Sequence, residues 1–128
     1  MSLRDVKEKY FENHAETREN HSNESHRTHY YKTSKDKAIS IIEAFFQHSP
    51  KYEINAISKE YGEISVNVKK GKKAFIVIAI IMVRPYQTAI DISVTTEAFL
   101  PFDFGYSNKL IAEIYKYFNK ELPLIKSE

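Results

Sequence analysis

Residues Ala74 to Val83 read Ala-Phe-Ile-Val-Ile-Ala-Ile-Ile-Met-Val, an unbroken apolar run between a lysine-rich turn at 69–73 and Arg84-Pro85. The run is too short to cross a bilayer, and its four isoleucines and two valines are typical of a β-strand. Because the run is apolar without alternation, we expect a strand that is buried on both faces. Such a strand should form the spine of a sheet.

The segments around this run alternate between apolar and polar residues, the pattern of strands with one wet face. These segments are 52–57, 64–68 and 90–95. Ile57 breaks the alternation of the first segment, which indicates a bulge or a sheet edge. Turn sequences at 61–62, 70–72 and 84–87 separate the strands, so sequential hairpins predict a four-stranded antiparallel meander.

Two amphipathic segments flank the predicted strands. In the first, at about 34–48, Thr33 or Ser34 can cap a helix, and Pro50 follows its end. In the second, Ser107 is the predicted cap. The apolar stripes are Ala38, Ile41, Ile42 and Phe45, widened by Ile39 and Phe46, in the first helix, and Leu110, Ile111, Ile114, Tyr115 and Phe118 in the second. The predicted fold class is therefore α+β, with both helices packed on one face of the meander.

Residues 1–32 are predicted to form a polar N-terminal arm ahead of a single α+β domain at 33–128. A short helix around 3–19, followed by a loop to Tyr31, fits the pattern of the arm. Four aromatic residues would hold the arm against its own domain or against a neighbouring chain: Tyr10, Phe11, Tyr30 and Tyr31.

The composition restricts the function classes. A chain of 128 residues fits one domain, and the absence of cysteine excludes disulfides and thiolate metal sites. Nineteen basic and 17 acidic residues give a net charge of +2, which argues against a dedicated nucleic-acid surface. The charged N-terminus has no apolar signal core, so we expect a soluble cytoplasmic protein with no membrane partner.

The stretch Asp103-Phe104-Gly105-Tyr106-Ser107-Asn108-Lys109-Leu110-Ile111 follows the predicted meander. It resembles a motif, Asp-Leu-Gly-Val-Asn-x-Lys-Arg-Ile, that introduces the last helix in a bacterial family of small domains of unknown function. The matching residues are Asp103, Gly105, Lys109 and Ile111, whereas Leu110 stands where the family has arginine. The resemblance covers roughly 30–122 and implies the order helix, four-stranded meander, helix. It carries over no catalytic residue.

Two polar groups could bind ions, and each has a simpler structural interpretation. His21, His26 and His29 offer ligands for a divalent metal, but the polar residues among them predict a loop without fixed geometry. The lysines at 69–73 could bind phosphate, but charged residues beside an apolar strand also protect it from aggregation. We therefore expect no metal site and no cofactor.

Three carboxylates, Asp91, Glu97 and Asp103, lie near hydroxyl side chains and are the candidates for acid–base chemistry. Their spacing requires no catalytic arrangement, and the sequence contains no triad signature. The chain is therefore predicted not to be an enzyme.

An aromatic set indicates a binding function instead. Its members are Phe75, Phe99, Phe102, Phe104, Tyr106, Tyr115 and Phe118. If the last helix does not lie flat on the sheet, these side chains would line a cavity between helix and sheet for a small apolar ligand.

A second hypothesis starts from the strand at 74–83. Its two faces are Phe75, Val77, Ala79, Ile81 and Val83 on one side, and Ile76, Ile78, Ile80 and Met82 on the other. One face meets the helices, while polar residues border the other face on the neighbouring strands. The N-terminal arm or a second copy of the chain should then cover that face. This hypothesis predicts a non-catalytic binding or self-association module that forms a homo-oligomer.

Overall fold

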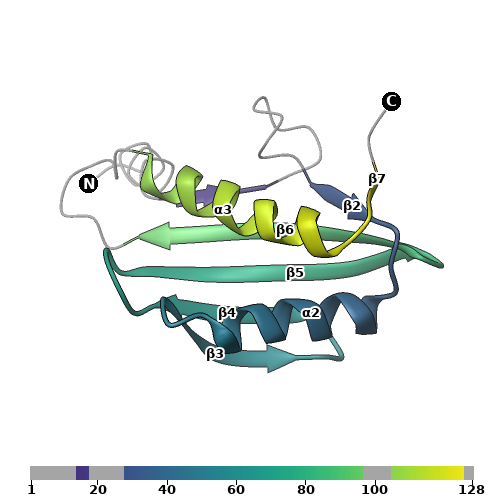
Figure 1. Cartoon of the computed structure of the whole chain (residues 1–128), viewed down its shortest axis with the longest axis horizontal. Coiled ribbons are helices and arrows are strands. Elements are labelled where there is room, and N and C mark those ends of the chain that lie inside the picture. The colour runs from purple at the N-terminus through teal and green to yellow at the C-terminus, as the bar shows by residue number, and fades with distance from the viewer. Residues whose placement is uncertain (1–13, 18–27, 97–104, 126–128) are drawn as a thin grey trace, which may run out of the picture.

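The computed structural model describes residues 14–17, 28–96 and 105–125 of the chain. Four consecutive strands pair antiparallel in sequence order: β3 (Tyr52–Ser58), β4 (Glu63–Val68), β5 (Ala74–Arg84) and β6 (Gln87–Thr96). Helix α2 (Lys35–His48) precedes them, and α3 (Tyr106–Glu121) follows them. Both helices lie on the same side of the sheet, in front of it in Figure 1. The predicted α+β class, with an antiparallel sheet and two helices, is confirmed.

The sheet has more strands than the predicted four. Three short strands, β1 (His14–Glu16), β2 (His29–Tyr31) and β7 (Leu124–Ile125), extend it to the order β3-β4-β5-β6-β2-β7, and β1 also pairs with β6. Strands β1 and β2 share one edge of β6, where β1 pairs with 93–95 and β2 with 88–90. The backbone N–H and C=O groups on that edge need partners, and these two segments supply them.

The interpretation of the arm is corrected at two places. Residues 14–16 and 29–31 are strands, although the sequence pattern predicted a helix around 3–19 and then a loop. Pairing with the edge of β6 overrides the local helical pattern, because the intrinsic helix preference of a short polar segment is weak. The rest of the predicted helix, residues 3–13 and 18–19, lies outside the described residues.

The two helices begin differently. The Ser34 side chain accepts a hydrogen bond of 3.2 Å from the Lys37 backbone N–H, so Ser34 caps α2 as predicted. Helix α3 instead begins after Gly105, whose φ of 77° is the left-handed conformation that glycine adopts without strain. The predicted cap, Ser107, lies inside the first turn and is buried. The prediction of Ser107 as the cap is therefore wrong.

Strand β5 shows which of its two faces meets the helices. Ile76, Ile78 and Ile80 are fully excluded from solvent and belong to the core between the sheet and the helices. The opposite face of β5 is partly exposed, so the expectation that both faces are buried is wrong for the described residues. The bulge predicted near Ile57 is present, since the register of β3 shifts between Ile54 and Ala56.

Within the described ranges, neither helix combines the length and the apolar content that crossing a membrane requires.

Candidate functional site on the open face of the sheet

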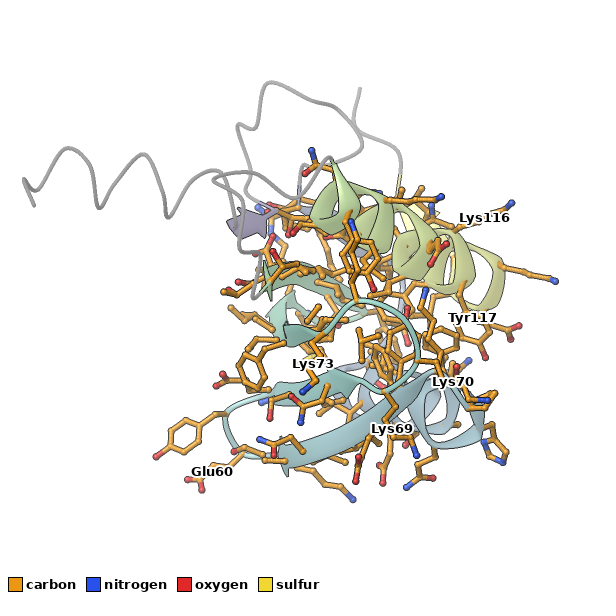
Figure 2. The ribbon with its side chains drawn as sticks, turned by 90° about the vertical axis from the view of Figure 1, so that its left-hand side faces the viewer. Glu60, Lys69, Lys70, Lys73, Lys116 and Tyr117 are labelled. Carbon is orange, nitrogen blue, oxygen red and sulfur yellow. The ribbon has the colours of Figure 1, made fainter. Side chains whose placement is uncertain are left out.

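The face of the sheet that points away from both helices carries an apolar stripe along β5. We call this set the open-face stripe; its members are Phe75, Val77, Ala79 and Ile81, together with Val83, which lies where the pairing with β6 shifts register between Met82 and Arg84. Phe75 is 41% exposed, Ile81 55% and Val83 48%, whereas Val77 and Ala79 are half-buried. In Figure 2 the helices lie on one side of the sheet, and the described residues place no element over the other side.

The borders of the stripe are polar, so the stripe is one strand wide. Val77 lies between Ser65 of β4 and Ser93 of β6. The pairing of β4 with β5 ends at Ala79, so the exposed end of β5 has a neighbour only on the β6 side. The two most exposed members of the stripe therefore lie where the β5–β6 hairpin extends past β4.

The other end of the open face is hollowed beside the β4–β5 hairpin. This hairpin hollow has a volume of about 650 Å³. It is lined by Glu53, Asn67, Val68, Lys69, Gly71, Lys73, Ala74, Phe75 and Thr95. Phe75 thus belongs both to the stripe and to the hollow, whereas Ile81 and Val83 lie at the far end of the strand.

A network of hydroxyl groups surrounds Asp91 at the edge of β6. The hydroxyls of Thr17 and Thr28 both donate to the same Asp91 oxygen, Oδ1, at 2.7 and 2.6 Å. The Thr17 hydroxyl also accepts a 2.7 Å bond from the Ile92 backbone N–H. We call this set the arm junction. It joins Thr17 and Thr28 to one carboxylate, at the place where β1 stops pairing with β6 and β2 begins.

Tyr115 of α3 reaches the arm junction from the helix side of the sheet. Its hydroxyl lies 2.6 Å from the Ile90 backbone oxygen, to which it donates, and 3.2 Å from the Thr17 hydroxyl. Burial raises the pKa of Tyr115 well above its ordinary value of 10.0, while the Thr17 hydrogen bond acts in the opposite direction. The phenol therefore stays protonated at neutral pH and serves as a donor. Asp91, the carboxylate that sequence reasoning considered for acid–base chemistry, instead accepts hydrogen bonds from the hydroxyls of Thr17 and Thr28.

Several residues of the predicted aromatic set and arm take part in packing. Tyr115 and Phe118 are buried, and the ring of Tyr115 stacks on His29 with 3.6 Å between centroids. The Tyr106 hydroxyl donates to the Lys72 backbone oxygen at 2.9 Å, which ties the start of α3 to the β4–β5 hairpin.

The two arm tyrosines within the described residues lie on β2. Tyr31 is fully buried and donates its hydroxyl proton to the Asn119 side-chain oxygen at 2.6 Å, so it joins β2 to α3. Tyr30 is half-buried and pairs with Ala89 of β6.

Other residues of the predicted sites lie outside the described residues. They are Tyr10, Phe11, His21, His26, Glu97, Phe99, Phe102, Asp103 and Phe104. In the part of the chain that is described, no three histidine or carboxylate side chains gather closely enough to hold a metal ion.

Sequence reasoning missed Thr17, Thr28 and the polar lining of the hairpin hollow. The two threonines are 74 and 63 residues from Asp91, and no local pattern relates them. Glu53 and Asn67 gave a weak signal, since both stand at wet-face positions of alternating strands. Only the register shows that they lie beside each other and beside Phe75.

Comparisons with models of protein families, with curated proteins and with solved structures found no match. The resemblance of the stretch at 103–111 to a bacterial domain family therefore stays a prediction.

Proposed function

We propose that this protein is a non-catalytic, cytoplasmic self-association module, in which the open-face stripe packs against the same stripe of a second copy. The observation that carries the proposal is the exposure of Ile81, 55%, on a sheet face that no described element covers. Val83, 48% exposed, follows where the pairing of β5 with β6 shifts register. Exposed apolar surface of this kind is typical of interaction sites.

The shape of the stripe favours a second copy as its partner. From Phe75 to Val83 it runs about 27 Å along β5, and it is only one strand wide. Two such stripes can pack face to face around a two-fold axis, because each surface then meets its own equivalent. Serine side chains border Val77, whereas Glu63 and Asp91 border Ala79, so close packing is expected to avoid the carboxylates beside Ala79.

The burial of the stripe supplies a modest driving force. Burying a whole isoleucine or valine side chain stabilises by about 1.5–3 kcal/mol, so completing the burial of Ile81 and Val83 contributes about 1 kcal/mol each. The association constant is therefore expected to depend measurably on a single side chain of the stripe.

The alternative function, a small apolar-ligand binder with its cavity between α3 and the sheet, has less support. The side chains of Leu110, Ile111, Ile114 and Phe118, which face the sheet from α3, are almost fully excluded from solvent by packing. We therefore place self-association first.

A matched pair of substitutions tests the proposal. Ile81→Lys puts a charge into the open-face stripe, whereas Met82→Lys puts the same charge on the other face of the same strand, at a residue of similar exposure. Light scattering coupled to size exclusion should show that Ile81→Lys lowers the mass to that of one chain and that Met82→Lys does not. Equal effects of the two substitutions, or wild-type protein that stays a single chain at every concentration, would contradict the proposal.

A further inference from the structure

We propose that the hairpin hollow binds a small anion that carries a flat ring, the chemistry of a nucleoside monophosphate. This inference does not rest on self-association, because Ile81 lies about 20 Å along β5 from the phenyl ring in the hollow. The residues that carry it are Glu53, Asn67, Lys69, Lys73 and Phe75.

The floor of the hollow is one row of side chains across four strands. Glu53 pairs with Asn67, Asn67 with Phe75, and Phe75 with Thr95. Paired residues of antiparallel strands project to the same face, and neighbouring strands lie about 4.8 Å apart. The row therefore presents a carboxylate, an amide and an aromatic ring to one space of about 650 Å³. That volume lies within the range of small-molecule sites.

Two lysines from the β4–β5 hairpin give the hollow its charge. Lys69 and Lys73 line it, and within the described residues neither side chain has an ion-pair partner. Figure 2 shows Lys73 on the open side of the sheet, whereas Lys70 of the same hairpin lies toward the helices. Glu53 is the one carboxylate among the lining residues, against two lysines, so the residues of the hollow carry a net positive charge. A phosphate or carboxylate group fits this charge.

Phe75 and the amide beside it define the rest of the ligand. The ring is 41% exposed in the floor of the hollow, where a flat ring can stack on it. Asn67 offers a donor and an acceptor side by side, and Glu53 offers acceptors for an amine or a hydroxyl group. The polar edge of a nucleobase or a ribose satisfies these groups, while the phosphate reaches the lysines.

The test uses the full chain and four probes in calorimetric titration. AMP and CMP carry both features, adenosine lacks the phosphate, and inorganic phosphate lacks the ring. We expect AMP or CMP to bind at least about tenfold more tightly than either partial probe, since loss of a charged hydrogen bond or a stacked ring costs about that factor. Absence of binding by both nucleotides, or equal binding of inorganic phosphate and AMP, would overturn the proposal.

Variants locate the site. Lys73→Gln should weaken AMP binding roughly tenfold, and Phe75→Leu should weaken it while keeping an apolar side chain in the sheet. Lys70→Gln is the matched control, because it removes the same charge from the same hairpin outside the hollow. Equal losses for Lys73→Gln and Lys70→Gln would show nonspecific attraction and would refute the site. Circular dichroism and the melting temperature of each variant confirm that it is folded.

Two further experiments identify the source of the ligand and distinguish nucleotide binding from self-association. A single-stranded oligonucleotide with a terminal phosphate presents the same chemistry as the free nucleotide, so tighter binding of the oligonucleotide identifies a nucleic-acid end as the source. Nucleotide binding measured on Ile81→Lys should be at least as tight as that of wild type, because this substitution lies outside the hollow and separation of the two copies would uncover Phe75. If Ile81→Lys abolishes AMP binding while remaining folded, the hollow is not the independent site that we propose.

Discussion

The arm junction gives the most direct test of how the N-terminal segments join the sheet. Asp91 Oδ1 accepts two short hydrogen bonds, from Thr17 and Thr28, at 2.7 and 2.6 Å. We expect Asp91→Ala to destabilise the fold, because it removes the acceptor of both hydroxyls in one step. Asp91→Asn keeps a side-chain oxygen but removes the charge, so it should cost about half as much.

The size of the effect follows from the two bonds. A hydrogen bond to a charged group contributes about 1.5–3 kcal/mol, and water can replace part of each bond because Asp91 is only half-buried. We therefore expect Asp91→Ala to lower the free energy of unfolding by about 2–3 kcal/mol. In urea denaturation, with a slope of about 2 kcal/mol per molar, the midpoint should fall by about 1 M.

Glu53→Ala is the control for this prediction, since it removes an exposed carboxylate from the same face of the sheet. It should change the free energy of unfolding by less than about 0.5 kcal/mol. A double-mutant cycle of Asp91→Ala with Thr28→Val should give a coupling energy of about 1 kcal/mol. An Asp91→Ala effect as small as that of the control, or strict additivity in the cycle, would refute the structural role of the arm junction.

Three further predictions concern the fold. Gly62→Ala should cost more than about 3 kcal/mol in urea denaturation, because an added Cβ would overlap the Ile80 carbonyl oxygen at a φ of 69°; Gly105→Ala, with φ 77° and open space around it, should cost only about 1 kcal/mol. Ser34→Ala removes the cap of α2 and should lower the free energy of unfolding by about 1 kcal/mol, and Ser34→Asp should restore it. The free energy of unfolding should fall as pH rises above 10.0, by up to about 1.4 kcal/mol per pH unit for each buried tyrosine, because burial holds the pKa of Tyr115 above 10.0 in the folded chain while the unfolded chain ionises there. Urea denaturation at several pH values on both sides of 10.0 measures this fall. The free energy of unfolding should depend less steeply on pH in Tyr115→Phe than in wild type, and an equal pH dependence would contradict the assignment.

Local periodicity was sufficient to predict the elements with long patterns. The period of two in β4 and β6 and the helical stripes of α2 and α3 are each repeated over several residues, so burial on one side fixes the type of element. The break at Ile57 was also visible, because a bulge moves the next apolar residue back to the core face.

Short pairings and distant contacts could not be predicted in the same way. Strands β1 and β2 have three residues each, too few to show a period, and they form because β6 offers an unpaired edge. The register of four strands brings Glu53 and Phe75 to one hollow, and a register is a property of the whole sheet. The predicted start of α3 was wrong because serine is a commoner helix cap than glycine. The left-handed conformation of Gly105 follows from the path of the backbone into the helix.

Sedimentation equilibrium over a range of concentrations tests whether the open-face stripe joins two copies of the chain, as we propose. We expect a mass that rises with concentration from 15.0 kDa, the mass of one chain, toward twice that value. Ile81→Lys should hold the mass at that of one chain, while Met82→Lys should follow the wild type. A wild-type mass of one chain at every concentration, or association that Ile81→Lys leaves unchanged, would contradict the proposal.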